Sequence, residues 1–357
     1  MGRHSFQLLL CAIAVSAVTG CGGFGPSVAA YSHASILSAL SLPAGYQGSA
    51  IAVQGSLAYV STMANGGQSG ARSLVIINLE SPAAPTILSA TSSGLSSDMA
   101  GIAVSGKYAY VTYESASGTN FQVWDVSNPT SPSVAGSTSI PCPTGMVPFR
   151  SPALVSNYAY VACWESEVTT TGAFAILDVS NPASPSAIGS VSVIAHYQPV
   201  SLVTSGQNLY VVATQGGSTG DYVLLYSIQN PVSPSLQATA PTAHSPQWVA
   251  AQGTMAVVAI YDAEELQVAD FSHPSSPQTH TVNLAPCRPM SVTVYQGSVA
   301  FAPCDSPGGV AEVDLAAAGS PSYVGTVLSG TVLNLVAGSG SYLYGVDTSG
   351  NFDTIGF

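Results

Sequence analysis

The chain has 357 residues, of which 46% are hydrophobic and only 6% charged, and its formal net charge is −12. So acidic a chain with so few Lys and Arg is not expected to bind nucleic acid, or an anionic membrane surface, through its charge. Helical periodicity is absent after the first twenty residues, and Pro and Gly occur at turn positions without forming a low-complexity block. The sequence therefore favours one large all-β domain. A surface with few titrating groups would also change little on acidification, which suits an acidic habitat.

The first residues are typical of a targeting signal. Arg3 and His4 precede an apolar run over residues 6–18, which is too short to span a membrane as a permanent helix. The run ends in Val18-Thr-Gly-Cys21, which resembles the lipobox of bacterial lipoproteins. That resemblance implies cleavage before Cys21 and acylation of this residue, and several acyl chains on one residue would anchor the protein stably to a membrane.

We therefore expect a lipoprotein signal peptide over residues 1–20, lipidation of Cys21 and a tether of small residues over 21–31. The alternative is ordinary secretory cleavage near Ala17 or Gly20.

From residue 32 onward the chain repeats one motif. A short run rich in β-branched and aromatic residues, typical of a strand, leads into an Asp and a turn built on Ser-Asn-Pro. Because Pro fixes its own φ and pushes the preceding residue out of the helical region, the chain must leave the sheet there. Clear copies span residues 121–132, 174–185, 223–234 and 266–277, and weaker copies span 74–85 and 310–321.

The repeated acids are Asp125, Asp178, Asp270 and Asp314. A carboxylate at this point can accept the backbone N–H groups that the turn leaves unpaired. The alternative is a set of metal ligands, but one residue in each repeat would lie far from the others in a radial fold. The structural role is therefore favoured.

Each motif is preceded by a second strand, and seven such strands recur at intervals of 43 to 51 residues, centred on Tyr59, Tyr110, Tyr160, Tyr210, Val257, Phe301 and Tyr344. Four antiparallel strands in each unit are the signature of a β-propeller blade. The last unit lacks room for its fourth strand, whereas residues 32–40 resemble such a strand. We predict a seven-bladed propeller over residues 32–357, closed by an N-terminal strand that completes the last blade.

The repeat resembles the LVIVD-repeat family of bacterial extracytoplasmic β-propellers, and Leu74-Val-Ile-Ile-Asn78 is a loose copy of the strand that names it. The resemblance extends over nearly all of residues 32–357. It implies the fold and a compartment outside the cytoplasm, but no activity and no catalytic residues.

Four cysteines of the propeller fall into two similar pairs, Cys142 with Cys163 and Cys287 with Cys304. In each pair the first residue precedes an innermost strand and the second ends the following strand, so a hairpin brings them side by side. We predict these two disulfides, which suit an oxidising compartment. A metal site is the alternative, although the spacings contain no Cys-x-x-Cys.

The same loops define one face of the ring, around the mouth of the central channel. Acidic residues gather in the loops between second and third strands, at Glu114, Glu165, Glu167, Asp221, Asp262, Glu264, Glu265, Asp305 and Asp347. Candidate binding residues at the channel mouth are Arg150, Arg288, Asp98, Gln198 and His244. The alternative is that these are ordinary loop residues, with each arginine paired to a neighbouring carboxylate.

Motifs for a nucleophile elbow, a P-loop, a zinc protease, an EF-hand or a dinucleotide site are not found where their chemistry would work. The sequence therefore predicts a lipid-anchored protein of the bacterial cell envelope, at the outer membrane or cell surface, that binds a surface protein or a glycan and needs no cofactor. Alternatives are a propeller enzyme or a cofactor- or metal-dependent propeller, with calcium as the ion to test, and a structural surface-layer component.

Overall fold

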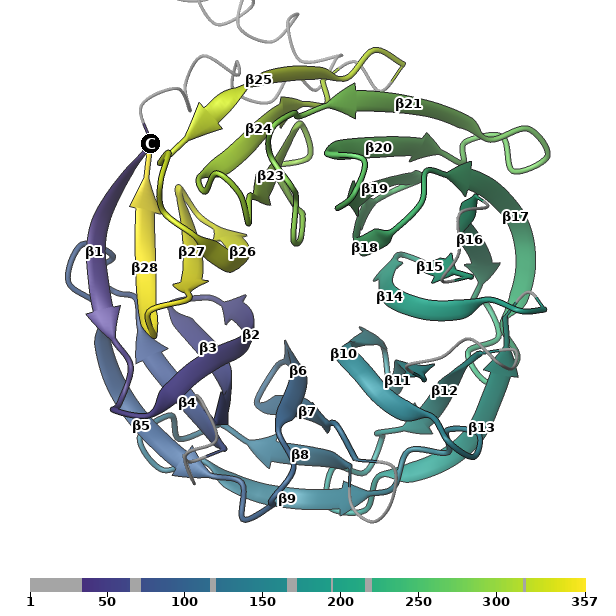
Figure 1. Ribbon diagram of the computed structural model, residues 1–357. Coiled ribbons are helices and arrows are strands. Elements are labelled where there is room, and N and C mark those ends of the chain that lie inside the picture. The colour runs from purple at the N-terminus through teal and green to yellow at the C-terminus, as the bar shows by residue number, and fades with distance from the viewer. Residues whose placement is uncertain are drawn as a thin grey trace, which may run out of the picture.

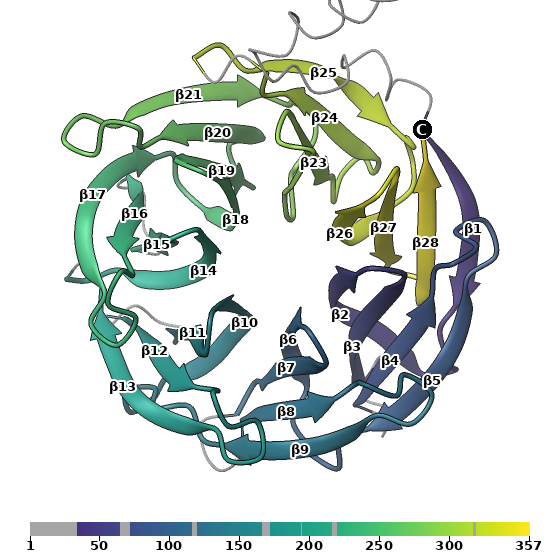
Figure 2. The ribbon, with the colours of Figure 1, turned by 180° about the vertical axis from the view of Figure 1, so that it is seen from behind.

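A computed structural model describes residues 34–64, 72–115, 120–165, 172–193, 195–215, 220–316 and 319–357. Over these residues the chain forms 28 strands in seven antiparallel sheets of four strands each. The sheets are arranged radially as blades around a central axis (Figures 1 and 2). This confirms the all-β, seven-bladed propeller predicted from the repeats. Within the described ranges, no helix has the length and apolar character needed to cross a membrane.

Each of the first six blades is built from four consecutive strands, with the first nearest the axis and the fourth outermost. Blades 1 to 3 contain β2 (Tyr46–Gln54), β3 (Leu57–Ala64), β4 (Ser73–Asn78), β5 (Thr86–Ser92); β6 (Met99–Ser105), β7 (Tyr108–Tyr113), β8 (Phe121–Asp125), β9 (Ser133–Thr138); and β10 (Val147–Val155), β11 (Tyr158–Trp164), β12 (Ala173–Asp178), β13 (Ser186–Ser192). Blades 4 to 6 contain β14 (Gln198–Ser205), β15 (Asn208–Thr214), β16 (Asp221–Ser227), β17 (Ser235–Thr242); β18 (Pro246–Gln252), β19 (Met255–Ile260), β20 (Glu265–Asp270), β21 (Gln278–Asn283); and β22 (Thr293–Tyr295), β23 (Val299–Pro303), β24 (Val310–Asp314), β25 (Ser322–Val327).

Blade 7 joins the two ends of the chain. It contains β26 (Leu333–Ser339), β27 (Tyr342–Asp347), β28 (Asn351–Gly356) and, outermost, β1 (Ser35–Ser41). The pairing of β1 with β28 is antiparallel and runs from Ser35 opposite Gly356 to Ser41 opposite Asn351. Figure 1 shows β1, at the purple end of the colour scale, lying along the yellow β28. The predicted closure is therefore confirmed. β1 supplies the fourth strand of the last blade and covers the edge of β28.

The core lies between adjacent blades. The second and third strands of each blade are buried on both faces, because each sheet is covered by its neighbours. Large side chains fill these layers, and Trp124, Tyr160, Tyr210 and Phe301 are fully buried. Trp124 therefore belongs to the blade core. Burial of this kind, rather than charge, stabilises the ring.

The repeated Asp residues act in their own turns, as predicted. The Oδ1 atom of Asp125 accepts the N–H of Ser127 at 2.9 Å. Asp178 and Asp270 make the same contact, two residues ahead, at 2.8 Å. Asp314 does so with Ala316, also at 2.8 Å. Each carboxylate thereby caps the turn that leads to the outermost strand.

Both predicted disulfides are present. Cys142 and Cys163 have Cα atoms 5.5 Å apart, and those of Cys287 and Cys304 are 5.1 Å apart. Each bond joins the segment before an innermost strand to the end of the strand that follows it, within blades 3 and 6. Two disulfides indicate an oxidising compartment outside the cytoplasm.

Candidate functional site

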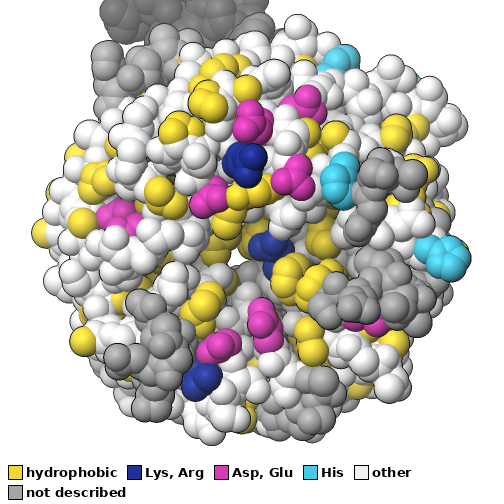
Figure 3. Space-filling view, viewed as in Figure 1, with side chains coloured by type: hydrophobic (Ala, Val, Ile, Leu, Met, Phe, Trp, Pro, Cys, Tyr) yellow, Lys and Arg dark blue, Asp and Glu magenta, His cyan; other side chains and the backbone are white. Residues whose placement is uncertain are grey.

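One face of the ring, which we name the mouth face, carries the segments that enter the innermost strands and the loops between second and third strands. Most of its surface is uncharged, but acidic and basic side chains gather around a central hollow (Figure 3). Because all innermost strands start on this face, equivalent positions of different blades converge on the hollow.

A β-bulge lies near the start of the innermost strand in six of the blades. The ladder breaks its register between Gly48/Ala50, Met99/Gly101, Phe149/Ala153, Pro199/Ser201, Pro246/Trp248 and Leu333/Leu335. A bulge inserts a residue that has no partner in the ladder and so re-aims its side chain. The residues at these breaks include Ser49, Ala100, Arg150, Val200, Gln247 and Asn334.

Five of those six residues line one cavity of about 250 Å³, which we name the mouth pocket. Its lining consists of Gly48, Ser49, Met63, Ala100, Arg150, Gln247, Trp248, Met290, Asn334 and Leu335. Farther along the channel lie two cavities of about 290 and 320 Å³. Trp248 lines all three cavities, and Arg150 lines the mouth pocket and the first of the other two. The mouth pocket therefore adjoins the rest of the channel at these two side chains.

Arg150 is held by aromatic rings. Its guanidinium carbon lies 4.8 Å from the ring centre of Phe149 and 4.9 Å from that of Trp248. Phe149 is itself stacked on Trp164, with ring centres 5.2 Å apart. One amino group, Nη2, donates to the Oε1 atom of Gln247 at 3.2 Å. Cation–π contacts and this hydrogen bond fix the orientation of the guanidinium in the channel.

The charge of Arg150 is poorly solvated. Burial lowers the pKa of Arg150 to about 10. The negative charge of Glu114 raises this pKa, but by a smaller amount. Its Nε atom is buried without a hydrogen-bond partner among the described residues. The guanidinium remains protonated at neutral pH, so a positive charge lies between the mouth pocket and the channel.

The backbone of blade 2 sets the position of Arg150. The hydroxyl of Thr112 donates to the Arg150 carbonyl at 2.7 Å, and the N–H of Ile102 donates to Oγ of Ser151 at 3.2 Å. Gly101 lies so close that a Cβ atom there would be 2.2 Å from the backbone nitrogen of Ser151. Arg150 also has a positive φ of 63°. The bulge of blade 3 is thus clamped against blade 2.

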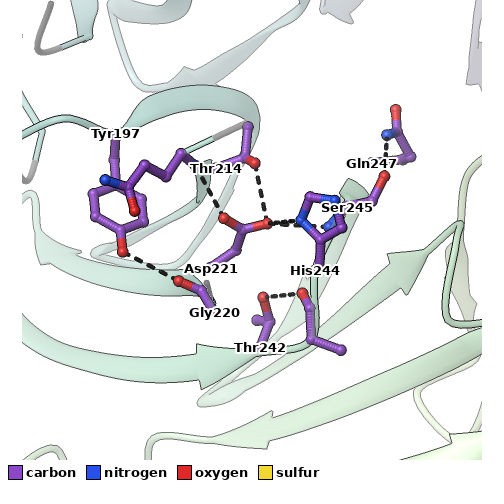
Figure 4. Close-up of polar contacts among 10 residues, drawn as sticks. Tyr197, Thr214, Gly220, Asp221, Thr242, His244, Ser245 and Gln247 are labelled. Carbon is purple, nitrogen blue, oxygen red and sulfur yellow. Dashed lines mark hydrogen bonds and ion pairs between the residues drawn. The ribbon is translucent and has the colours of Figure 1, made fainter. Parts of the chain in front are cut away.

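His244 and its surroundings support the segment that presents Gln247 (Figure 4). The buried Asp221 accepts hydrogen bonds from Oγ1 of Thr214 at 3.0 Å and from the N–H of Ser245 at 3.1 Å. Its Oδ2 atom also lies 3.7 Å from Nδ1 of the partly exposed His244. Ser245 has a φ of 69°. The contacts of Asp221 hold this turn, and Gln247 follows it in β18.

The other predicted candidates lie outside the mouth pocket. Asp98 forms an ion pair with Arg72, whose Nε atom is 2.9 Å away. Gln198 is buried and donates to Oε1 of Glu165 at 3.0 Å.

Arg288 lies in blade 6 with its side chain 46% exposed. Its Nε atom is 3.6 Å from Oε1 of Glu264, and its guanidinium lies 5.5 Å from the ring centre of Tyr261. Tyr261 in turn donates to Asp305 at 2.5 Å. Of the five candidates, the structure therefore places only Arg150 in the pocket.

Sequence reasoning missed Trp248, Gln247 and Asn334. The three tryptophans of the chain do not recur with the repeat, so Trp248 gave no signal of its own. Gln247 was missed because the candidate chosen in blade 5, His244, lies three residues earlier, and Asn334 was missed because no candidate was named in blade 7. One signal was available, since Gln247 directly precedes the alternating apolar run of β18.

Among the described residues, no three His, Cys, Asp or Glu side chains lie together as a group able to hold a metal ion. Glu167, one of the expected acidic loop residues, lies outside the described residues. So do the predicted signal peptide, Cys21 and the tether.

The fold and the mouth pocket define the class of this protein as a seven-bladed β-propeller with a lined channel mouth. The chain carries LVIVD repeats, because the family model described as LVIVD repeat matches residues 97–139 and 151–193. These segments correspond to blade 2 and most of blade 3. The resemblance noted in the sequence is thereby confirmed for these two segments.

Solved structures share the fold at low sequence identity. A putative 6-phosphogluconolactonase from Bacteroides fragilis aligns over 81% of this chain and 86% of its own, with 12% identity and a TM-score of 0.64. The Cps50 (Swd1) β-propeller domain of Myceliophteria thermophila aligns over 89% of this chain and 99% of its own, with 10% identity and a TM-score of 0.64. The computationally designed protein Ika8 aligns over 89% of this chain and 98% of its own, with 9% identity and a TM-score of 0.57. Among curated proteins no match was found. Such identities show the fold alone.

Proposed function

We propose that this protein is a lipid-anchored binding protein of the bacterial cell envelope, which holds a surface protein or glycan at its mouth pocket. The observation that carries the proposal is the variation of the bulge residues. Ser49, Ala100, Arg150, Gln247 and Asn334 occupy comparable positions in five blades and differ from one another.

That variation contrasts with the rest of the repeat. Four of the six turn motifs keep the Asp and all six end in Pro, and the second strands keep an aromatic or apolar residue at the same place. A position that served only the fold is expected to keep one kind of side chain in most of the blades. Different side chains at converging positions instead build an asymmetric pocket, and an asymmetric pocket on a rigid ring suits selective binding.

The pocket itself has the composition of a binding site. It combines an aromatic ring, aliphatic walls, two amide side chains and one cation at a single place. Small sites of this kind use apolar surface for affinity and a few placed polar groups for orientation. The disulfides and the lipobox-like start agree with a location in the cell envelope.

Site-specific photo-crosslinking tests the binding role. A photoreactive phenylalanine analogue replaces Met63, which lines the mouth pocket, or Gln278, which is exposed on the outermost strand of blade 5. After illumination of intact cells, we expect a discrete adduct from position 63 and none from position 278. Equal adducts from both positions, or none from position 63, would contradict the proposed mouth-face function.

The anchor is tested by Cys21→Ser. We expect this variant to move from the membrane fraction to the soluble fraction, because it has no thiol to acylate. Mass spectrometry of the mature wild-type protein should show an acylated N-terminal Cys21. An unmodified N-terminus at residue 18 or at Cys21 would show ordinary secretory cleavage instead.

A further inference from the structure

The mouth pocket contains a cation whose charge no described carboxylate neutralises. Arg72 and Arg288 are paired with Asp98 and Glu264, with nitrogen–oxygen distances of 2.9 and 3.6 Å. Over the described ranges, no ion pair within 4.0 Å joins Arg150 to an acid. Glu114 acts on Arg150 only through its field. A partly buried charge without a counter-ion is costly, so the site favours a ligand that brings a negative group.

The guanidinium is prepared for a planar anion. Phe149 and Trp248 hold it, and Gln247 engages one amino group through Nη2. A guanidinium has five N–H groups arranged as a fork, which match the two oxygens of a carboxylate. Since its neighbours already fix its orientation, little side-chain freedom remains to be lost on binding.

The remaining walls match a sugar ring better than an acidic side chain. Asn334 and the Ser49 hydroxyl add hydrogen-bonding groups, and Met63, Met290 and Leu335 add apolar surface beside Trp248. A carboxylate on a short peptide side chain would use only the cation. A ring that carries one carboxylate and several hydroxyls would use the cation, the polar groups and the apolar walls together. The volume of about 250 Å³ suits one such residue rather than a larger ligand.

We propose that the mouth pocket binds a sugar acid, a uronate residue of an acidic glycan, whose carboxylate pairs with Arg150. This inference rests on the proposed binding function and specifies its ligand. Trp248 would pack against the ring, while Asn334 and Ser49 would bind its hydroxyls. Gln247 acts as a positioning residue, since it orients Arg150 rather than replacing it.

The test is calorimetric titration of the full chain in detergent with glucuronate, glucose and N-acetylglutamate. We expect saturable binding of glucuronate. Glucose, which lacks the carboxylate, and N-acetylglutamate, which lacks the sugar ring, should each bind at least about tenfold more weakly. Absence of saturable glucuronate binding would overturn the proposal. So would glucose or N-acetylglutamate binding as tightly as glucuronate; the second result would indicate an acidic peptide.

Variants complete the test. Arg150→Gln should weaken glucuronate at least about tenfold, and Arg150→Lys, which keeps the charge but loses the fork, should give an intermediate loss. Arg288→Gln, which removes a partly exposed and ion-paired arginine, is the matched control and should bind as wild type. Unchanged binding by both Arg150 variants would also overturn the proposal. If glucuronate does not bind while position 63 still crosslinks a partner, the mouth pocket binds a ligand of another chemical class. If glucuronate does not bind and position 63 gives no crosslink, the proposed binding function is itself contradicted.

Discussion

Raising the pH from 5 to 8 is expected to lower the free energy of unfolding of this protein by about 4 kcal/mol. The cause is two buried carboxyl groups in the last two blades, Glu312 in β24 and Asp353 in β28, which are 1% and 2% exposed. Oε1 of Glu312 and Oδ2 of Asp353 have no hydrogen-bond partner among the described residues.

Burial raises the pKa of Glu312 to about 7, with a smaller contribution from Asp314. Burial likewise raises the pKa of Asp353 to about 6, with a smaller contribution from Asp347. The folded protein therefore holds protons that the unfolded chain has already released. The stabilisation from this effect is complete below the unfolded pKa values near 4, and it is lost as the pH rises through 6 and 7.

Urea denaturation at pH 5 and pH 8 measures the effect. Glu312→Gln keeps the side-chain size without the ionisation, so it should remove more than half of the pH dependence and should be more stable than wild type at pH 8. Glu80→Gln, at an exposed turn position, should leave the pH dependence unchanged. A wild-type protein that is as stable at pH 8 as at pH 5 would show that these carboxyls are solvated or paired.

Gly101→Ala is expected to lower the free energy of unfolding by about 3 kcal/mol or more. The added methyl carbon would lie 2.2 Å from the Ser151 nitrogen and 2.3 Å from the Arg150 carbonyl carbon, which are backbone atoms of another blade. A flexible side chain could rotate away from such a clash, but two hydrogen-bonded strands cannot. Blade 2 and blade 3 must therefore move apart.

Gly189→Ala is the matched control, because a Cβ atom at Gly189 would meet nothing within 4 Å. It should be neutral or slightly stabilising, since alanine restricts the unfolded chain. Melting curves of both variants give the comparison. Because the clash falls on Arg150, Gly101→Ala should also weaken any ligand of the mouth pocket. Equal stability of the two variants would mean that the blade 2–blade 3 contact is looser than the structure shows.

Much of the fold could be predicted because the determinants are local and repeated. The six turn motifs mark where strands end, and the seven recurring second strands give the number of blades. The missing strand of blade 7 and the spare strand at residues 32–40 then imply closure. Similarly, the disulfides follow from the equal placement of Cys142 and Cys163 in blade 3 and of Cys287 and Cys304 in blade 6.

The mouth pocket could be predicted only in part, because it depends on the bulges. A shift of one residue in a strand reverses which side chains face the channel. The bulges are set by contacts between blades, such as that of Gly101 with Ser151, and leave no clear mark on a single repeat. Arg150 was found because arginines are few in this chain and this one directly precedes the segment expected as an innermost strand. Asp98 and His244 were chosen at the wrong offset, whereas Ala100 and Gln247 occupy the mouth.

The direction of β1 determines how an anchored ring would be presented. β1 ends beside the loop that enters β2 on the mouth face, so it begins at the opposite face, next to the end of β28. Residues 22–34 would connect a lipid on Cys21 to that far edge, a reach of at most about 45 Å. A protein anchored in this way would have its mouth face directed away from the membrane. It would also stay close enough to the bilayer to contact polymers that lie along the membrane surface.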